Sequence, residues 1–417
     1  MMIVVLVAAV ALVLVRWLPA GARLPVTVVA VVALVVGAVT VGYRWQVAPI
    51  LAGGAVALAF AVPPLLRPGR TAWRAKWWLA LPGSLACLGL VAAGGGAAWA
   101  LPLPEFPEPT GPHAVGTTVM QWSGKDRIVV AQIWYPARKS PAPGAQYVQR
   151  EVTGAVADYL GVPGFLLDEL PRARTHAVTG APVDAGRFAV VLFSPGLGGV
   201  RSQNTAWAEE LASRGYVVAA LDHLHDSAAV VLADGSIVRT RVRSTGDDAA
   251  DRRLAAGWST ARAADLSFAL TELGRSRLAG SLDLERVAVT GHSIGGSAAL
   301  QAARLDSRFD AVVDLDGYPH DPAPGPFHQP VLALTHELAP GENPGYLPRL
   351  RQVLALSTGK TRLVTVPGTA HLTFTDAPLY LPPLPGLVGS LGRTEGVRIT
   401  VEQTAAFLGA ALYGRPY

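Results

Sequence analysis

Four long apolar runs without a charged side chain fill the first quarter of the chain. They are Met1–Val15, Leu24–Val41, Val47–Leu66 and Trp77–Leu103. A hydrocarbon core about 30 Å thick needs about 20 helical residues, so the last three runs are long enough to cross a bilayer. The first run is shorter, but Trp17 and Leu18 extend it and the Arg16 side chain can reach the interface. The pattern therefore predicts a domain of four transmembrane helices over residues 1–104.

A secretory signal peptide is the alternative interpretation of the first run. Residues 20–22, Ala-Gly-Ala, faintly resemble a cleavage site. No Lys or Arg precedes the apolar run, however, whereas signal peptides begin with positive charge. We therefore expect a membrane span here.

The distribution of charge sets the expected topology. Residues 1–104 hold seven basic residues and no acidic one, whereas the other 313 hold 28 basic and 30 acidic. The formal net charge of +5 thus belongs to the apolar region and does not indicate a nucleic-acid partner. The basic residues are Arg16 and Arg23 in the first predicted loop, Arg44 in the second, and Arg67, Arg70, Arg74 and Lys76 in the third. Positive charge favours the cytoplasmic side, so both the N-terminus and everything after the fourth span are predicted outside the cytoplasm.

Composition narrows the class of protein further. Hydrophobic residues make up 51% of the chain and charged residues 16%, against about 25% charged in ordinary soluble domains. The single cysteine, Cys87, excludes an intramolecular disulfide and zinc sites built from several cysteines. A proline-rich stretch at residues 105–112 is typical of a stiff spacer, which leaves 113–417 as a second domain.

Short apolar runs alternate with helical patterns in this second domain. Predicted strands cover 114–122, 127–135, 188–193, 216–221, 286–290, 311–315, 331–335 and 362–366. Predicted helices cover 203–214, 265–273, 295–304, 346–356 and 401–412. This alternation predicts an α/β fold with a mostly parallel sheet covered by helices on both faces.

The chemistry is concentrated in Gly291-His-Ser-Ile-Gly295. A bare G-x-S-x-G pattern is weak in a chain rich in glycine, but this one directly follows a predicted strand and precedes a helix of small residues. A tight strand-to-helix turn would push the Ser293 hydroxyl out of the sheet edge, and the helix N-terminus would supply free N–H groups. Ser293 is therefore predicted to be a nucleophile, although a capping serine is the plainer interpretation.

A serine nucleophile needs a base, and the base needs an orienting acid. Asp316 ends a predicted strand and is favoured as the acid, because catalytic groups gather at the carboxyl ends of parallel strands; Asp314 lies inside that strand. His371, in a loop after a late strand, is favoured as the base over His336 and His328.

Two further groups complete the predicted chemistry. Residues 194–199, Ser-Pro-Gly-Leu-Gly-Gly, could supply a backbone N–H to an oxyanion, with Ile294 supplying the other. His223 and His225 could share one strand face as metal ligands, but no third and fourth ligand follows in a matching pattern. No metal or cofactor is therefore expected.

Five segments carry a resemblance to a known family. They are Gly111–Gly116, Phe193–Gly198, Leu211–Ala220, Gly280–Val289 and Gly291–Gly296. The chain from about Gly111 onward resembles the plasma-type platelet-activating factor acetylhydrolases, the lipoprotein-associated phospholipase A2 family of α/β-hydrolases. The spacing of Ser293, Asp316 and His371 fits that family.

The resemblance implies an α/β-hydrolase fold and a calcium-independent serine esterase that removes short or oxidised sn-2 acyl groups from phospholipids. It also implies Leu197 and Ile294 as oxyanion donors. Two departures are the four predicted spans, which the family pattern lacks, and Ile294, where the family has an aromatic residue. A general carboxylesterase or polyester hydrolase, and a membrane protein with a retired hydrolase domain, are the alternative functions.

Two surface features bear on the expected substrate. The segment 317–330 is too short for a lipase-type cap, and the long excursion 223–262 is charged, so we expect an open site that favours short acyl chains. The apolar segment 379–388 is interpreted as a packed loop or as a rim that touches the bilayer. The catalytic domain is expected at the outer face of a membrane, and the patterns define no oligomeric state.

Overall fold

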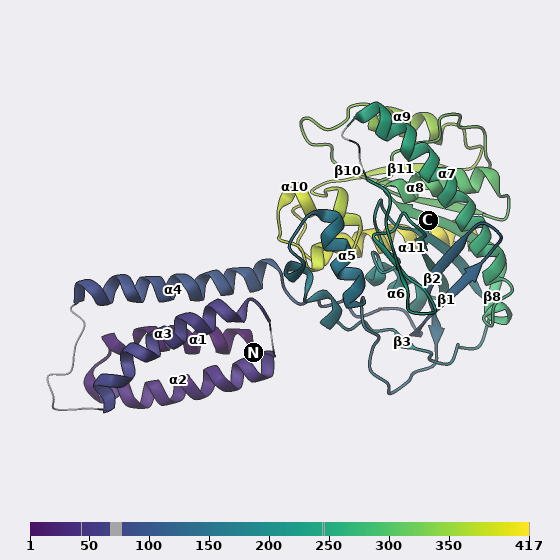
Figure 1. Cartoon of the computed structure of the whole chain (residues 1–417). Helices are drawn as coiled ribbons and strands as arrows, with labels where there is room; N and C mark the ends of the chain where they lie inside the picture. Colours follow the sequence, from purple (N-terminus) through teal and green to yellow (C-terminus); the bar gives the residue numbers. More distant parts are fainter. Residues whose placement is uncertain (43, 67–76, 244, 246, 417) are drawn as a thin grey trace. The chain divides into compact units, whose positions relative to one another are not determined.

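The computed structural model describes the chain except for residues 43, 67–76, 244, 246 and 417. It forms two compact units, Met1–Pro102 and Leu103–Tyr417 (Figure 1). The four basic residues of the third predicted loop, at 67, 70, 74 and 76, lie outside the described residues.

The N-terminal unit consists of four helices that pack around a small apolar core. They are α1 (Met2–Leu14), α2 (Ala20–Val41), α3 (Val47–Leu66) and α4 (Trp77–Ala100), with a 3-10 turn at Val15–Trp17. The helices α3 and α4 approach closely: an added Cβ at Gly53 of α3 would lie 2.7 Å from the carbonyl oxygen of Cys87 in α4. Small residues at helix contacts are typical of membrane bundles, where close packing replaces the hydrophobic effect.

The outer surface of this unit is also apolar. Its exposed large apolar side chains include Ile3, Val7, Val28, Val29, Val32, Val35, Val36, Val39, Phe60, Leu85 and Trp99. A water-exposed bundle would place polar residues on this surface. The unit therefore exposes a large apolar surface.

Helix length supports fewer spans than we predicted. Within the described residues, only Ala20–Val41 and Ala80–Ala100 are long and apolar enough to cross a membrane, with mean hydropathies of 2.6 and 1.5. Met2–Trp17 and Val47–Val62 form shorter apolar helices. The first helix is short because Leu18 is extended and Pro19 precedes α2, so Leu18 does not lengthen α1 as we had expected.

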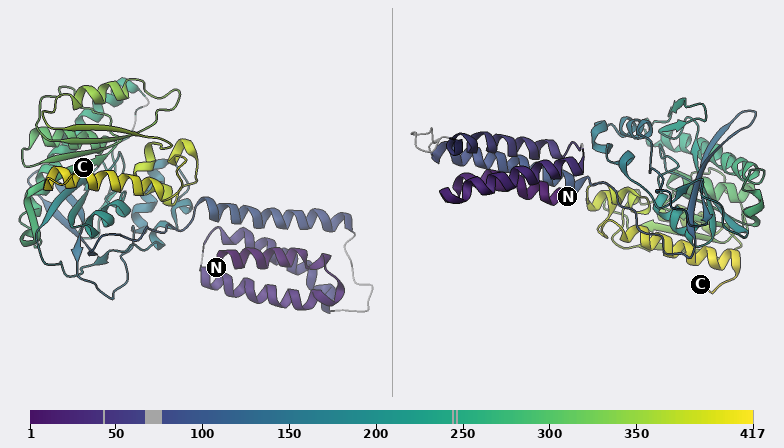
Figure 2. Two further views of the ribbon diagram at one scale, coloured as in Figure 1. Left: turned by 180° about the vertical axis from the view of Figure 1, so that it is seen from behind. Right: turned by 90° about the horizontal axis from the view of Figure 1, so that it is seen from below.

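The second unit is built on a nine-stranded sheet with the order β11-β10-β9-β8-β4-β5-β2-β1-β3 (Figures 1 and 2). The strands are β1 (Ala114–Ser123), β2 (Ile128–Ala137), β3 (Val178–Thr179), β4 (Phe188–Ser194), β5 (Tyr216–His223), β8 (Leu282–His292), β9 (Ala311–Leu315), β10 (Val331–His336) and β11 (Thr361–Val366). The six strands from β11 to β5 run parallel, and β2 joins them antiparallel. The predicted mostly parallel sheet is thus confirmed.

Helices cover both faces of the sheet, as predicted. The helices are α5 (Arg150–Leu160), α6 (Thr205–Ser213), α7 (Asp248–Leu273), α8 (Ile294–Leu305), α9 (Tyr346–Leu354), α10 (Pro385–Val388) and α11 (Glu395–Tyr413). Side chains of α7, α8 and α9 share one core with alternate strand residues such as Val190 and Leu192. Side chains of α6 and α11 share the other core with Val191 and Phe193. Strands buried on both faces explain the continuous apolar runs in the sequence.

The region between β5 and residue 262 is more regular than we predicted. A short hairpin of β6 (Ala229–Val231) and β7 (Ile237–Arg239) is followed by α7, which begins at Asp248 rather than near 265. The Asp247 side chain caps α7 by accepting a hydrogen bond of 2.6 Å from the backbone N–H of Ala250. The early turns of α7 carry charged residues that hid its helical periodicity.

Candidate active site

Ser293 occupies a strained turn between β8 and α8. Its backbone has φ 58° and ψ −124°, a conformation that a side chain other than glycine adopts at a cost of about 1–3 kcal/mol. The flanking glycines permit the turn: an added Cβ at Gly291 would lie 2.1 Å from the backbone of Gly295, and one at Gly295 would lie 2.0 Å from the carbonyl oxygen of Ser194. Such strain persists mainly at functional sites, which fits the predicted role of Ser293.

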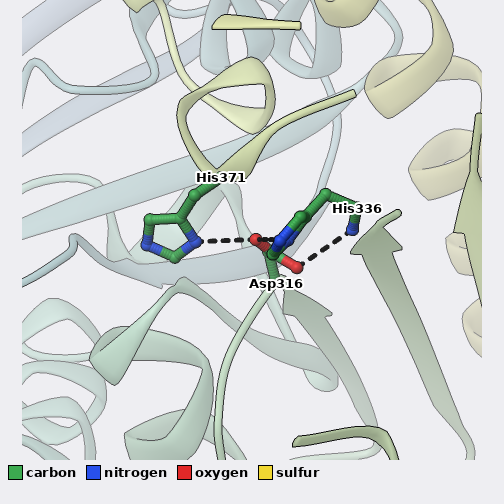
Figure 3. Close-up of side chains that lie close together, drawn as sticks. All are labelled: Asp316, His336 and His371. Atoms are coloured by element: carbon green, nitrogen blue, oxygen red, sulfur yellow. Dashed lines mark hydrogen bonds and ion pairs between the residues drawn. The ribbon is translucent and has the colours of Figure 1, made fainter. Parts of the chain in front are cut away.

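Asp316 directly follows β9, in the left-handed region at φ 56°, and its carboxylate is surrounded by hydrogen-bond donors. Oδ1 accepts from the Tyr346 hydroxyl at 3.0 Å and from the backbone N–H of His336 at 3.1 Å. Oδ2 accepts from Nδ1 of His371 and from Nδ1 of His336, both at 2.6 Å (Figure 3). Asp316 therefore lies where an acid that orients His371 is needed.

The two neighbouring aspartates differ in charge. Burial alone would raise the pKa of Asp316, but the hydrogen bonds and charges of His336 and His371 outweigh it and lower that pKa. Burial, and then the charge of Asp316, raise the pKa of Asp314 well above its usual range. Oδ1 of Asp314 accepts only the backbone N–H of Gly317, at 2.9 Å. Asp316 is thus the ionised acid of the pair, and Asp314 is neutral.

His371 begins a 3-10 turn, His371–Phe374, and its side chain is 43% exposed. Because Nδ1 donates to Asp316, the other ring nitrogen, Nε2, has no proton in the neutral ring and can accept one. Ser293, Asp316 and His371 line one cavity of about 320 Å³. The predicted base therefore has the tautomer that proton transfer from a serine requires.

His292, which directly precedes Ser293, is hydrogen-bonded to the backbone of His371. Its Nε2 donates to the His371 carbonyl oxygen at 3.0 Å, and its Nδ1 accepts from the Gln203 side chain at 3.1 Å. Burial, and then the nearby His371, lower the pKa of His292 to about 3, so it stays neutral. Gln203 in turn accepts the backbone N–H of Gly196 at 3.0 Å. This network joins the nucleophile turn, the base and the loop after β4.

The loop after β4 lies beside the nucleophile, because Leu197, Ser293 and Ile294 line a second cavity, of about 620 Å³. Among the described residues, the backbone N–H groups of Leu197 and Ile294 donate no hydrogen bond to another residue. Arg262 of α7 holds the loop in place. It pairs with Asp226 through two bonds of 2.6 Å and donates to the carbonyl oxygens of Pro195 and, at 3.1 Å, of Gly196.

Among the described residues, His223 and His225 belong to no cluster with metal-ligand spacing. His223 bonds to Ser194 and Asp265, each at 2.9 Å, while Asp226 pairs with Arg262. Within the described residues, the one cluster with ligand spacing is Asp316, His336 and His371. The Nδ1 atoms of His336 and His371 both donate to the Asp316 carboxylate, so these three side chains form a hydrogen-bonded network.

Sequence reasoning considered His336 as an alternative base and, more often, as a hydrogen-bonded histidine of the core or rim, but it missed the contact with Asp316. The position of His336 at the end of the strand beside β9 was the available signal. It also missed a second Ser-His-Asp chain, formed by Ser194, His223 and Asp265. Ser194 has no exposed surface, so a substrate cannot reach it.

Comparison with known protein families and curated proteins gives consistent matches. A family model described as platelet-activating factor acetylhydrolase, isoform II, matches residues 101–237 and 252–413. The platelet-activating factor acetylhydrolase of Cavia porcellus is 27% identical over 244 residues, which cover 51% of this chain and 55% of that protein. The enzyme of the same name from Canis lupus familiaris is 25% identical over 309 residues, covering 65% and 68%. The chain thus aligns with little more than half of the guinea-pig protein.

Solved structures also match the second unit. A ferulic acid esterase from Streptomyces cinnamoneus superposes with a TM-score of 0.65 and is 31% identical. The superposition covers 76% of this chain and 95% of that structure. The sheet and its helices therefore have the arrangement of an esterase of the α/β-hydrolase type.

Proposed function

The chain belongs to the platelet-activating factor acetylhydrolase, isoform II family, and from this premise we propose that it is a serine ester hydrolase acting on short or oxidised sn-2 acyl groups of phospholipids. The observation that carries the proposal is the hydrogen bond of 2.6 Å between His371 and the ionised Asp316, in the cavity lined by Ser293. A general base that is held by an orienting acid and lies beside a serine raises the reactivity of the serine hydroxyl.

The proposed reaction proceeds through an acyl-enzyme. Ser293 attacks the ester carbonyl while Nε2 of His371 takes its proton and later delivers it to the leaving alcohol. Asp316 keeps the ring oriented and stabilises the imidazolium. The N–H groups of Leu197 and Ile294 stabilise the oxyanion, and water then releases the acyl group.

A broader esterase activity is the second candidate function, because an esterase of ferulic acid is among the similar structures. Trp258 of α7 lines the larger cavity together with Leu197 and Ile294 and offers an aromatic surface to an aryl ester. A panel of substrates on the full-length protein separates the two: acetyl and long-chain phospholipids, a simple chromogenic ester, a feruloyl ester and a polyester. Activity confined to the last three would refute the phospholipid assignment.

The site should prefer short acyl chains. The 15 residues between β9 and β10 form no helix that could act as a cap, and the His371 side chain is 43% exposed, so water reaches the site without an interface. We expect kcat/KM to fall as the sn-2 chain grows from two to sixteen carbons. A rising trend, or a jump in rate above the micelle threshold of the substrate, would contradict the open-site interpretation.

We further propose that residues 1–104 anchor the enzyme in a membrane, with the catalytic domain outside the cytoplasm. Four spans are proposed, although among the described residues only Ala20–Val41 and Ala80–Ala100 reach the usual spanning length. The apolar outer surface of α1–α4, the absence of acidic residues and the basic residues of the first and third predicted loops support this topology. Leu384, 57% exposed beside the buried Leu379 and Val388, is the residue of the 379–388 segment best able to contact lipid.

A reporter fusion tests the topology. A phosphatase that folds only outside the cytoplasm, fused after Pro112, should be active, whereas a cytoplasmic reporter at the same position should be silent. The same pair fused after Gly42, in the second predicted loop, should also report the outside, whereas a fusion after Leu18 should report the cytoplasm. Cytoplasmic activity after Pro112, or cleavage of the chain near Ala22, would overturn the four-span arrangement.

A further inference from the structure

His336 lies between two carboxylates, and both of its ring nitrogens are engaged. Nδ1 is 2.6 Å from Oδ2 of Asp316, and Nε2 is 2.9 Å from Oε2 of Glu342 (Figure 3 shows the Asp316 side). Ionised carboxylates only accept hydrogen bonds, so both nitrogens must carry a proton. The ring is therefore a cation, and its side chain is only 10% exposed.

The surroundings of His336 favour this cation. The hydrogen bond to Asp316 has the largest effect on the pKa of His336 and raises it. Burial lowers this pKa, whereas the charges of Asp316 and Glu342 raise it further, so that it reaches about 9. Glu342 is itself held by the backbone N–H of Ala339 at 2.8 Å. The Tyr346 ring stacks on the His336 ring, with 6.3 Å between the ring centroids. Burial raises the pKa of the Tyr346 hydroxyl, which stays protonated.

Other ionisable groups also lie near the pair. The ring of His371 lies 6.2 Å from that of His336, and the ring of His292, which is neutral, lies 4.6 Å from His371. Asp314 is neutral, as argued above. Arg252 of α7, Tyr318 and His320 line the cavity that His336 also lines. Among these groups, His336 and His371 bond to the same oxygen of Asp316.

We propose that His336, held as a cation between Asp316 and Glu342, is a positioning residue of the active site: it fixes the carboxylate that orients His371 and offsets part of its charge. The proposal rests on the proposed function, since it concerns the same triad. Its consequence concerns the pH profile of the enzyme. The ring centroids of His336 and His371 are 6.2 Å apart, so a positive charge at His336 repels a second positive charge on the His371 ring.

The test is the pH profile of kcat/KM in variants of His336. In His336→Asn the side-chain amide can still donate to Asp316, but the charge is lost. We expect its acidic limb to move up by about one pH unit, since like charges roughly 6 Å apart repel appreciably in a half-buried site. His336→Ala should show the same shift and, because Asp316 loses a donor, a kcat at least about tenfold lower.

A neighbouring carboxylate provides the matched control. Glu337 directly follows His336 and is exposed, but its carboxylate accepts a hydrogen bond of 3.1 Å from the backbone N–H of Gly368, whereas the His336 ring bonds to Asp316 and Glu342. Glu337→Gln should leave the acidic limb in place. Glu342→Gln should instead make His336 easier to deprotonate, so the pH at which the His336 ring becomes neutral should fall.

A measurement on the unmodified enzyme keeps the proposal testable if a variant does not fold. Nitrogen-15 NMR of histidine in the wild-type protein at pH 7.5 should show one side chain, assignable to His336 by its perturbation in Glu342→Gln, with both nitrogens protonated. The stability that the cation provides is complete below about pH 6.5 and should be lost as the pH rises through about 9.

Two results would overturn the proposal that His336 is a cationic positioning residue. One is a neutral His336 at pH 7.5, and the other is an acidic limb of the kcat/KM profile that does not move in folded His336→Asn and His336→Ala. Failure of the proposed function looks different. In that case Ser293→Ala would retain the wild-type ester hydrolysis, whatever the pH profile of the His336 variants.

Discussion

Replacing Ser293 or His371 with alanine should lower kcat at least about 10³-fold while the protein stays folded, because triad members act as a unit. Ser293 faces a cavity and provides no side-chain cap to α8, so its hydroxyl contributes little to the fold. Circular dichroism and the thermal midpoint check folding, and a short-chain ester assay measures kcat. Wild-type turnover by either variant would contradict the proposed mechanism.

The two aspartates provide a matched pair for the same prediction. Asp316→Asn should be severely impaired, because an amide in place of Oδ2 would place its own N–H groups against the N–H donors of His336 and His371. Asp314→Asn should remain active, since Asp314 is already neutral and its Oδ1 need only accept the N–H of Gly317. If Asp314→Asn were the inactive variant, the assignment of the acid would be wrong.

Gly295→Ala should have the largest effect on stability. The added Cβ would lie 2.0 Å from the carbonyl oxygen of Ser194 and 2.7 Å from that of Pro195. Both are backbone atoms where β4 ends. To relieve the clash, the loop after β4, which holds Leu197, would have to move away from Ser293. We expect a loss of about 3 kcal/mol or more in the free energy of unfolding, and loss of activity in any folded fraction.

Gly257→Ala is the matched control, because Gly257 also lies in a helix, α7, but has no atom within 4 Å of an added Cβ. The substitution should leave the free energy of unfolding unchanged, or raise it by up to about 1 kcal/mol through higher helix propensity. Thermal unfolding in detergent compares the three proteins. Equal midpoints for wild type and Gly295→Ala would show that the turn tolerates a Cβ, against the geometry described here.

The local pattern of apolar and turn residues was sufficient to predict much of the fold. The strands β4, β5, β9 and β10 are buried along their whole length, and β8 is buried from Val287 onward, so each contains a short apolar run in the sequence. The strained turn at Ser293 was also predictable, since glycines at fixed offsets between a strand and a helix allow few other conformations.

Contacts between distant segments could not be predicted in the same way. His336 meets Asp316 because β9 and β10 are parallel neighbours and the backbone N–H of Asp316 donates to Leu334 at 2.7 Å, a register that no local pattern encodes. Arg262 reaches the loop after β4 from α7, a helix whose first turns the apolar pattern did not predict. These turns carry charged residues, and the side chain of Asp247 caps them.

The most direct test of the central claim, that Ser293 is an activated nucleophile, is labelling of the full-length protein with a fluorophosphonate probe followed by mass spectrometry of its peptides. We predict a single adduct, on Ser293, that appears at a far lower rate in His371→Ala. Ser194, which also bonds to a histidine but has no exposed surface, should remain unlabelled. Ester hydrolysis by a protein that carries no adduct on Ser293, or equal labelling of another serine, would contradict the account.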